Sequence, residues 1–213
     1  MGLAGRAIGA ARRSRAPKGE GERLREEILA ATERLLLESG DESAVSIRAI
    51  AGAVGVTPPS LYLHFADKEE LIHAVCQRRF AELEARIEAE VQGVHDPVEQ
   101  LRRRGRAYVA FGVENPEHYR ILFLGKHAFT REDFEAGVVP GVEGFRHLVA
   151  NVEAGMASGA FAPADSFLVA CGLWAVVHGI TSLRITVTAF PLVDSDALTE
   201  HVLDVAIRGL APR

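Results

Sequence analysis

Residues 46–68 read SIRAIAGAVGVTPPSLYLHFADK and predict two short helices joined by a glycine turn. In the first helix Ile50 and Val54 repeat at i,i+4, which is the spacing of a buried stripe. Gly55 stands where the chain must reverse, a position that favours a residue tolerant of positive φ. The pattern therefore predicts a helix, a tight turn and a second helix.

The second helix exposes small, polar and aromatic side chains. Leu61 and Phe65 repeat at i,i+4 and predict the face that packs on the rest of the protein. Ser60, Tyr62 and His64 lie off this stripe and are free to face a groove of DNA. Such a pair of helices is typical of a helix-turn-helix DNA reader.

This stretch also resembles the signature of TetR/AcrR-type bacterial transcriptional regulators. The matching residues are Ile50-Ala51, Gly55-Val56, Leu61-Tyr62, His64-Phe65 and Asp67-Lys68-Glu69. The resemblance covers roughly residues 23–71 and implies double-stranded DNA as the partner, with Lys68 on a phosphate. The expected DNA-binding residues are Ser46, Arg48, Thr57, Pro58, Pro59, Ser60, Tyr62, His64 and Lys68.

Pro58-Pro59 departs from the family pattern, in which many members carry a small residue and a glycine. Proline is tolerated in the first helical turn, where its missing N–H would lack a partner anyway. A residue before proline is pushed out of the α region. We therefore expect Pro58 to lie outside the helix and Pro59 to begin it, with two backbone donors lost to a phosphate.

The composition fits an intracellular protein with a real core. The chain has 213 residues, of which 48% are hydrophobic and 25% charged, enough for one extended or two small domains. We see no apolar run of the ~18 residues that span a bilayer and predict a cytoplasmic protein without a membrane partner. Cys76 and Cys171 make no disulfide framework, and each is expected to be a small buried hydrophobe rather than a redox sensor.

Charge is unevenly distributed. The net charge is −5, yet the first eighteen residues hold five basic residues and no acid. The remaining 19 basic residues face 29 acidic ones, so the body carries −10. We interpret residues 1–21 as a disordered basic arm that reaches phosphates or the minor groove. A solvated tail, or a start codon assigned too far upstream, explains the segment equally well.

Helical spacing continues through the rest of the chain, and we predict an all-α fold. Residues 22–68 form a three-helix DNA-binding domain, and residues 69–213 a helical ligand-binding and dimerisation domain. Asp67 and Glu70 open a long helix that joins the two domains as a rigid lever. The basic run Arg102-Arg103-Arg104 is expected on a solvated face. Two apolar helices, about 165–190 and 194–209, are expected to form a homodimer interface.

The C-terminal half resembles the effector domain of one TetR subgroup, marked by a Trp-His-Gly motif. The resemblance rests on WAVVHG at residues 174–179 and ENPEHYRILF at residues 114–123. It implies an apolar cavity for a small molecule. The candidate lining residues are Tyr108, Phe111, Tyr119, Phe123, Trp174 and His178, with Phe129 and Phe145 beside them. The alternative is that these side chains simply fill the core.

Other functional classes receive less support. The sequence has no HExxH or Cys-x-x-Cys pair, no GxSxG elbow and no GxxxxGK loop, so we predict no catalytic residue, metal or cofactor. A nucleoid structural protein would need broad positive charge, which the acidic body lacks. We predict a sequence-specific regulator, most often a repressor in this family, that a small apolar effector releases from a near-palindromic operator. A constitutive or protein-regulated DNA-binding protein is the alternative.

Overall fold

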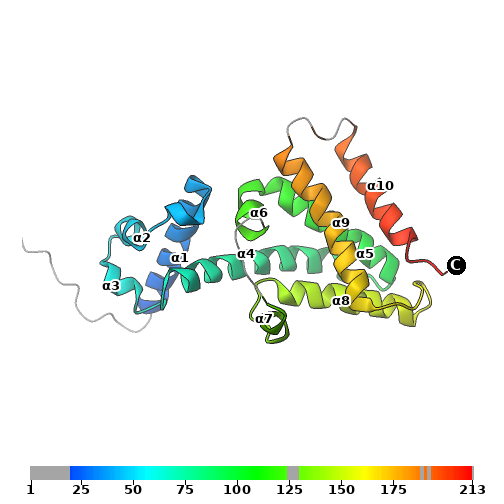
Figure 1. Cartoon of the computed structure of the whole chain (residues 1–213), viewed down its shortest axis with the longest axis horizontal. Helices are drawn as coiled ribbons and strands as arrows, with labels where there is room; N and C mark the ends of the chain where they lie inside the picture. The colour runs from blue at the N-terminus through cyan, green and yellow to red at the C-terminus, as the bar shows by residue number, and fades with distance from the viewer. Residues whose placement is uncertain (1–19, 124–129, 188–189, 191–192, 213) are drawn as a thin grey trace, which may run out of the picture.

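The computed structural model describes residues 20–123, 130–187, 190 and 193–212, and every regular element within them is a helix (Figure 1). This confirms the predicted all-α fold. Residues 1–19 of the predicted basic arm lie outside the described residues, whereas its last two residues, Glu20 and Gly21, belong to α1, so the arm was predicted to end two residues too late. The elements are α1 (Glu20–Ser39), the 3-10 helix η1 (Glu42–Ala44), α2 (Ile47–Val54), α3 (Pro58–Leu61), α4 (Lys68–Val91), α5 (Pro97–Glu114), α6 (Pro116–Phe123), α7 (Arg131–Glu135), α8 (Val142–Ala157), α9 (Ser166–Thr186) and α10 (Ser195–Arg208).

The N-terminal unit packs α1, α2 and α3 around one apolar core, as predicted. Ile50, Leu61 and Phe65 are all buried in it. Ser46 caps α2, since its side chain accepts a hydrogen bond of 3.2 Å from the backbone N–H of Ala49. Gly55 ends the helix at φ 78°, the left-handed conformation that the turn was expected to need.

Helix α3 differs from the prediction at both ends. Pro58 lies inside the helix at its first position, and Thr57 before it is extended at φ −88° and ψ 149°. Thr57 obeys the restriction that Pro58 places on the residue before it, whereas Pro58 is helical although Pro59 follows it. Both prolines occupy the first turn, whose N–H groups need no partner. Regular helix already ends at Leu61, and a hydrogen-bonded turn carries the chain on to Phe65.

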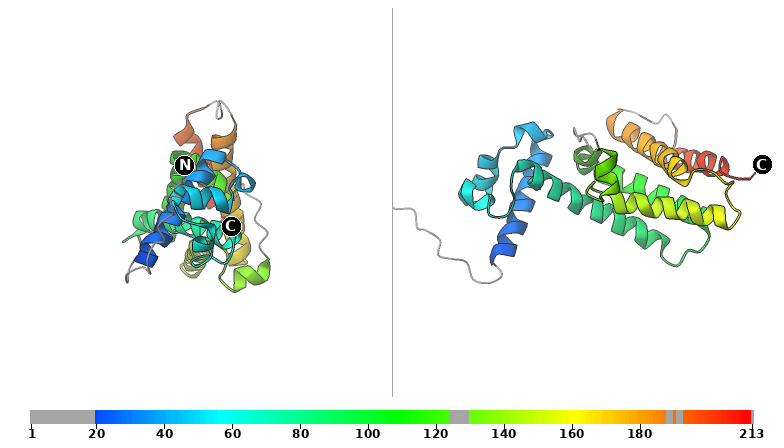
Figure 2. Two further views of the ribbon diagram at one scale, coloured as in Figure 1. Left: turned by 90° about the vertical axis from the view of Figure 1, so that its left-hand side faces the viewer. Right: turned by 60° about the horizontal axis from the view of Figure 1, so that its bottom comes forward.

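Helix α4 joins the two halves, as expected. Asp67 caps it by accepting a 2.7 Å hydrogen bond from the backbone N–H of Glu70. Its first turns bury Leu71 and Val75 in the core of the DNA-binding unit, and further along it buries Leu83. The right-hand view of Figure 2 shows α4 extending from the N-terminal helices along the C-terminal ones. One continuous helix therefore belongs to both packing units.

The C-terminal unit is assembled on α5, which contacts α4, α6, α8, α9 and α10. Two glycines let the neighbouring helices approach it closely. A Cβ added at Gly105 would overlap the side chain of Leu203 in α10, and one added at Gly112 would overlap Thr181 in α9. The prediction that the basic run lies on a solvated face was wrong for two of its residues. Arg102 binds Asp204 of α10 at 2.8 Å, and the side chain of Arg104 is largely buried.

Helix α9 ends at Thr186, a few residues earlier than predicted. Its length and mean hydropathy of 1.7 meet the criteria for a membrane span, so the expectation that no segment reaches them was wrong. The expectation considered uninterrupted apolar runs only, and α9 has no such run of sufficient length because small and hydroxylated residues alternate with its apolar ones. Core helices of water-soluble proteins have the same length and composition. In α9, however, only 17% of this window is buried inside the chain, so most of its apolar surface is exposed there.

The close packing at Gly112 gives a test of this core. We expect Gly112→Ala to lower the free energy of unfolding by ~1–3 kcal/mol, because the added methyl group meets Thr181 and lies 2.8 Å from Cδ2 of Tyr119. Gly144→Ala is the matched control, since a Cβ there meets nothing within 4 Å. The control should leave stability unchanged or raise it by up to ~1 kcal/mol. Urea denaturation measures both, and equal stabilities would contradict the tight packing of α5.

Candidate functional site

The expected DNA-binding residues gather on the outer side of α2 and α3. Arg48 is exposed on α2, and Tyr62 after α3 keeps 53% of its surface exposed. The hydroxyls of Thr57 and Ser60 lie 3.0 Å apart at the start of α3. Ser46 is exposed but is also the cap of α2. The structure therefore brings a polar surface to the two helices predicted to read DNA.

Two more of the expected DNA contacts, Lys68 and His64, have a structural role as well. The Nζ of Lys68 donates a 2.7 Å hydrogen bond to the backbone carbonyl of Glu42 in η1, which joins the start of α4 to the first helices. His64 is half-buried, and its ring lies beside Gly21 in α1. A phosphate contact by Lys68 remains a prediction, and it would use the two ammonium protons that Glu42 leaves.

One exposed side chain was missed from the sequence. Leu63 has 84% of its surface exposed, beside Tyr62 in the turn after α3. Apolar residues in the major groove contact the methyl group of thymine. Its place outside the Leu61 and Phe65 stripe was the signal, which we overlooked because leucine is apolar. Leu63 therefore joins the candidate DNA-binding residues.

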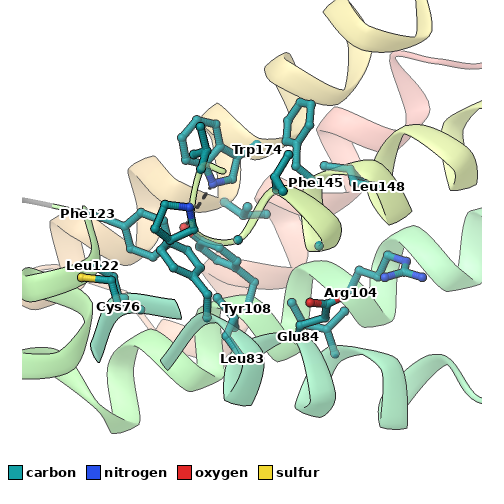
Figure 3. A pocket seen from close by; sticks show the side chains of 18 of the residues that line it. Cys76, Leu83, Glu84, Arg104, Tyr108, Leu122, Phe123, Phe145, Leu148 and Trp174 are labelled. Carbon is teal, nitrogen blue, oxygen red and sulfur yellow. Dashed lines mark hydrogen bonds between the residues drawn. The ribbon is translucent and has the colours of Figure 1, made fainter. Parts of the chain in front are cut away.

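The second candidate site is a cavity of about 1050 Å³ bordered by α4, α5, α8 and α9. Its walls are aromatic and aliphatic, and Figure 3 shows Tyr108, Phe123, Phe145 and Trp174 around it. The aliphatic lining residues include Leu83, Ile87, Leu101, Leu122, Leu148, Val177 and Ile207. Pockets of this size and character hold small apolar molecules in proteins.

The structure corrects the expected lining at three positions. Tyr108, Phe123 and Trp174 line the cavity, as does Phe145. Phe111 and Tyr119 are instead buried in the core behind the wall, and His178 is outside the lining. Helical spacing alone does not tell which side of α5 or α6 faces the cavity. Phe129 lies outside the described residues.

Two lining residues, Tyr108 and Trp174, form a hydrogen-bonded group with Tyr119 and His178 behind the wall. Tyr119 Oη lies 2.6 Å from Nδ1 of His178 and 3.3 Å from Oη of Tyr108, which accepts from Nε1 of Trp174 at 3.3 Å. Burial raises the pKa of Tyr119 to about 12 and lowers the pKa of His178. All four side chains are therefore uncharged at neutral pH, and they hold Trp174 against the cavity.

Charged residues meet at one end of the cavity. Arg104 of α5 donates a 2.6 Å hydrogen bond to Glu88 of α4, and its buried Nε has no partner. His147 of α8 approaches Glu84 at 3.1 Å and Glu88 at 3.2 Å. Figure 3 shows Glu84 and Arg104 at the opposite end from Phe123. The cavity thus has one polar end and one aromatic end.

A buried ion-pair network links the two units. Glu33 of α1 pairs with Arg79 of α4, and its Oε1 lies 3.0 Å from Nε2 of His118 in α6. The Glu33 side chain is only 9% exposed, so these partners are needed to balance its charge. Because Phe123 at the other end of α6 lines the cavity, α6 touches both the cavity and the first helix of the DNA-binding unit.

The two cysteines lie on the cavity wall. Cys76 is buried, as expected, and burial with help from Glu42 raises the pKa of its thiol to about 12. A thiol with so high a pKa provides little reactive thiolate at neutral pH. Cys171 is only half-buried. Within the described ranges, no group of three His, Cys, Asp or Glu side chains could hold a metal ion.

Family models match both halves of the chain. Residues 28–75 match the model for bacterial regulatory proteins of the tetR family. Residues 101–206 match the model for a tetracyclin repressor-like, C-terminal domain. The first range holds the candidate DNA-binding surface, and the second holds most of the cavity wall.

Curated relatives match part of the chain. The HTH-type transcriptional activator FasR of Mycolicibacterium smegmatis is 30% identical over 112 residues, which are 53% of this chain and 49% of that protein. The nucleoid occlusion factor SlmA of Vibrio campbellii is 31% identical over 98 residues, 46% of this chain and 50% of that protein. The chain thus matches about half the length of each curated relative.

Solved structures share the whole fold. A protein of unknown function from Rhodococcus sp. RHA1 has a TM-score of 0.73 at 26% identity, covering 89% of this chain and 96% of that one. The fatty acid degradation regulator FadR from Bacillus halodurans has a TM-score of 0.70 at 19% identity, covering 87% and 98%. The latter likeness shows the fold alone.

The exposed polar surface generates a prediction for DNA. Tyr62→Phe and Lys68→Ala should weaken binding to specific and random duplexes alike, because phosphate contacts position a protein without reading sequence. Arg48→Ala should cost ~1–3 kcal/mol on the specific sequence only. Fluorescence anisotropy with labelled duplexes measures both losses. Thermal unfolding of Lys68→Ala separates lost DNA contacts from the lost bond to Glu42, and equal losses on both duplexes would remove Arg48 from base reading.

Proposed function

The chain belongs to the TetR family of bacterial transcriptional regulators, and we propose that it is a cytoplasmic repressor that a small apolar effector releases from a near-palindromic operator. The observation that carries this proposal is the cavity of about 1050 Å³ against α4, the helix shared with the DNA-binding unit. We also propose that Trp174, His178 and Gly179 mark the Trp-His-Gly subgroup. The hydrogen bonds of Trp174 to Tyr108 and of His178 to Tyr119, beside the cavity, support that assignment.

The contacts of α4 and α6 support a route from effector to DNA. Lining residues of α4 lie on the same rigid helix as Leu71 and Val75 in the DNA-binding core. Helix α6 lines the cavity through Phe123 and meets Glu33 of α1 through His118. An effector shifts the protein from the conformation that fits the operator to the one that fits it poorly only if it binds the second conformation more tightly. Displacing either helix changes the spacing of two DNA-binding units in a dimer.

The exposed face of α9 supports dimerisation through the last two helices. Leu168 and Leu183 leave 70% and 44% of their surfaces exposed, and Val205 of α10 leaves 59%. Between the two leucines, an added Cβ at Gly172 or Gly179 meets nothing within 4 Å, so a partner helix could approach closely. An apolar face of this length favours a second copy of the chain, and a two-fold dimer reads a near-palindromic site.

Two relatives bear on the alternatives. The name of the Mycolicibacterium relative describes an activator, and the alternative to repression is that this chain raises transcription. The name of the Vibrio relative describes a nucleoid occlusion factor, which is compatible with the alternative of a constitutive or protein-regulated DNA-binding protein. The cavity favours an effector over that second alternative. A reporter gene behind the operator, compared with and without the protein, distinguishes repression from activation.

The dimer face provides one prediction. Ala175→Arg places a charge on the exposed face of α9, where a second copy would bury it. We expect a monomer at micromolar concentration and a loss of at least tenfold in operator affinity. Ala150→Arg, on the exposed side of α8, is the matched control and should stay dimeric. Analytical ultracentrifugation measures the mass, and a dimeric Ala175→Arg protein with full affinity would refute this interface.

The link through α6 provides a second prediction. His118→Ala removes a contact to Glu33 but no cavity residue, so it should spare effector binding and weaken the coupling to DNA. Coupling free energies of ~1–3 kcal/mol correspond to release factors of about 5- to 150-fold, which this variant should reduce several-fold. Binding is followed by the fluorescence of Trp174, the chain's single tryptophan, and release by operator anisotropy.

The matched control is His95→Ala, which changes an exposed histidine after α4. Compounds for the titration are apolar molecules chosen because they change Trp174 fluorescence without DNA. If His118→Ala releases the operator as wild type does, the signal does not pass through this contact. If no bound compound releases the operator from wild-type protein, the proposed switch is refuted.

A further inference from the structure

We propose that the effector of this cavity is a lipophilic cation, an apolar molecule carrying one positive charge that pairs with Glu84. The inference rests on the proposed function in that it takes the cavity as the effector site. It goes further by assigning the charge of the ligand. Four features of the lining support it: the balance of charge, the pairing of Arg104, the position of Glu84 and the aromatic walls.

The charge on the wall is strongly one-sided. At the polar end of the described lining, Glu84 and Glu88 are two acids against Arg104, the single lysine or arginine of that lining. The other lining acids, Glu42, Asp67, Glu69 and Glu70, lie near the start of α4, and the last three are exposed to solvent. The potential inside a cleft of low dielectric follows the sign of the charges that line it. An entering cation is therefore attracted, and an entering carboxylate or phosphate is repelled.

The single guanidinium on the wall is already paired. Arg104 Nη1 donates to Oε1 of Glu88 at 2.6 Å, and 13% of the Arg104 side chain is exposed. Its unpartnered Nε–H offers one donor to an anionic ligand. That anion, however, would lie next to Glu88 and near Glu84, so a third negative charge would enter the same end of the cavity. One donor does not offset that repulsion.

Glu84 is placed to pair with a ligand cation. It lies one helical turn before Glu88 on α4, on the cavity wall, and its side chain is 26% exposed. Its recorded ion-pair partner is Nδ1 of His147 at 3.1 Å, a group that carries charge only when protonated and that also faces Glu88. The carboxylates of Glu84 and Glu88 have one permanent positive charge beside them, the guanidinium of Arg104. A protonated amine at this place would supply a second.

The remaining walls suit the body of such a ligand. Tyr108, Phe145 and Trp174 present aromatic rings to the cavity, and the faces of such rings attract cations as well as apolar groups. Trp174 keeps 39% of its surface exposed, so its ring is available to a ligand. The nearby hydrogen-bonded group of Tyr119 and His178 adds no positive charge at neutral pH.

The test uses three probes that share one alkyl chain and differ in the head group: decylamine, decanol and decanoate. Each is titrated at neutral pH, below its micelle concentration, into the full-length protein without DNA. Trp174 fluorescence reports binding, since it is the chain's single tryptophan. We expect decylammonium to bind most tightly, decanol less tightly and decanoate most weakly. Tighter binding of decanoate or decanol than of decylammonium, or no binding by any probe, overturns the inference.

A matched pair of variants assigns the charge to one residue. Glu84→Gln keeps the size of the side chain and removes its charge, and it should weaken decylammonium binding roughly tenfold while leaving decanol unchanged. Glu90→Gln makes the same change on the exposed side of α4, outside the lining, and should alter neither. Equal weakening by the two variants would show that only the overall charge matters and would overturn the role of Glu84.

Operator anisotropy with the same probes separates this inference from the proposed function. Tight binding of decylammonium without release of DNA supports the charge preference and contradicts the proposed switch. Release of DNA by decanoate at a lower concentration than by decylammonium supports the switch and overturns the charge preference. Selective binding of decylammonium together with release of DNA supports both.

Discussion

The continuity of α4 is the constraint on which the rest of the molecule depends. Its first turns bury Leu71 and Val75 against the DNA-binding helices, and later turns carry Leu83, Glu84 and Glu88 to the cavity. Because a helix is a stiff element whose interior backbone groups are hydrogen-bonded from turn to turn, the two units cannot shift independently along it. Asp67, which caps the start of α4, therefore affects both units because it determines where the shared helix begins.

Signals that act within a few residues could be read from the sequence. Gly55 adopts the positive φ expected of it, and Asp67 caps α4 where the sequence predicts the long helix to begin. These features depend on local sterics and on backbone groups at helix ends, which change little with the surroundings. The all-α fold and the helix-turn-helix follow from them.

Contacts between distant segments could not be read in this way. Phe111 and Phe145 look alike as aromatic residues on amphipathic helices, yet the first fills the core and the second lines the cavity. Arg104 belongs to a basic run that suggests solvent, and α4 brings Glu88 to it from sixteen residues away. Which face of a helix meets a cavity depends on how the helices cross, and no single helix encodes that.

The two prolines that open α3 have a consequence for the unfolded chain. Each proline ring holds φ near the helical value before folding, and Pro58 also restricts Thr57 to the extended backbone that it adopts at the cap. The unfolded ensemble is thereby narrowed at Thr57 and at the φ angles of both prolines, so less conformational entropy is lost there on folding, whereas Pro59 disfavours the helical conformation that Pro58 adopts. A four-residue helix is too short to be stable by its own hydrogen bonds, and Leu61 at its end is buried in the apolar core of the DNA-binding unit. The same rings leave the start of α3 without two N–H groups, so side chains must provide the hydrogen bonds to DNA there.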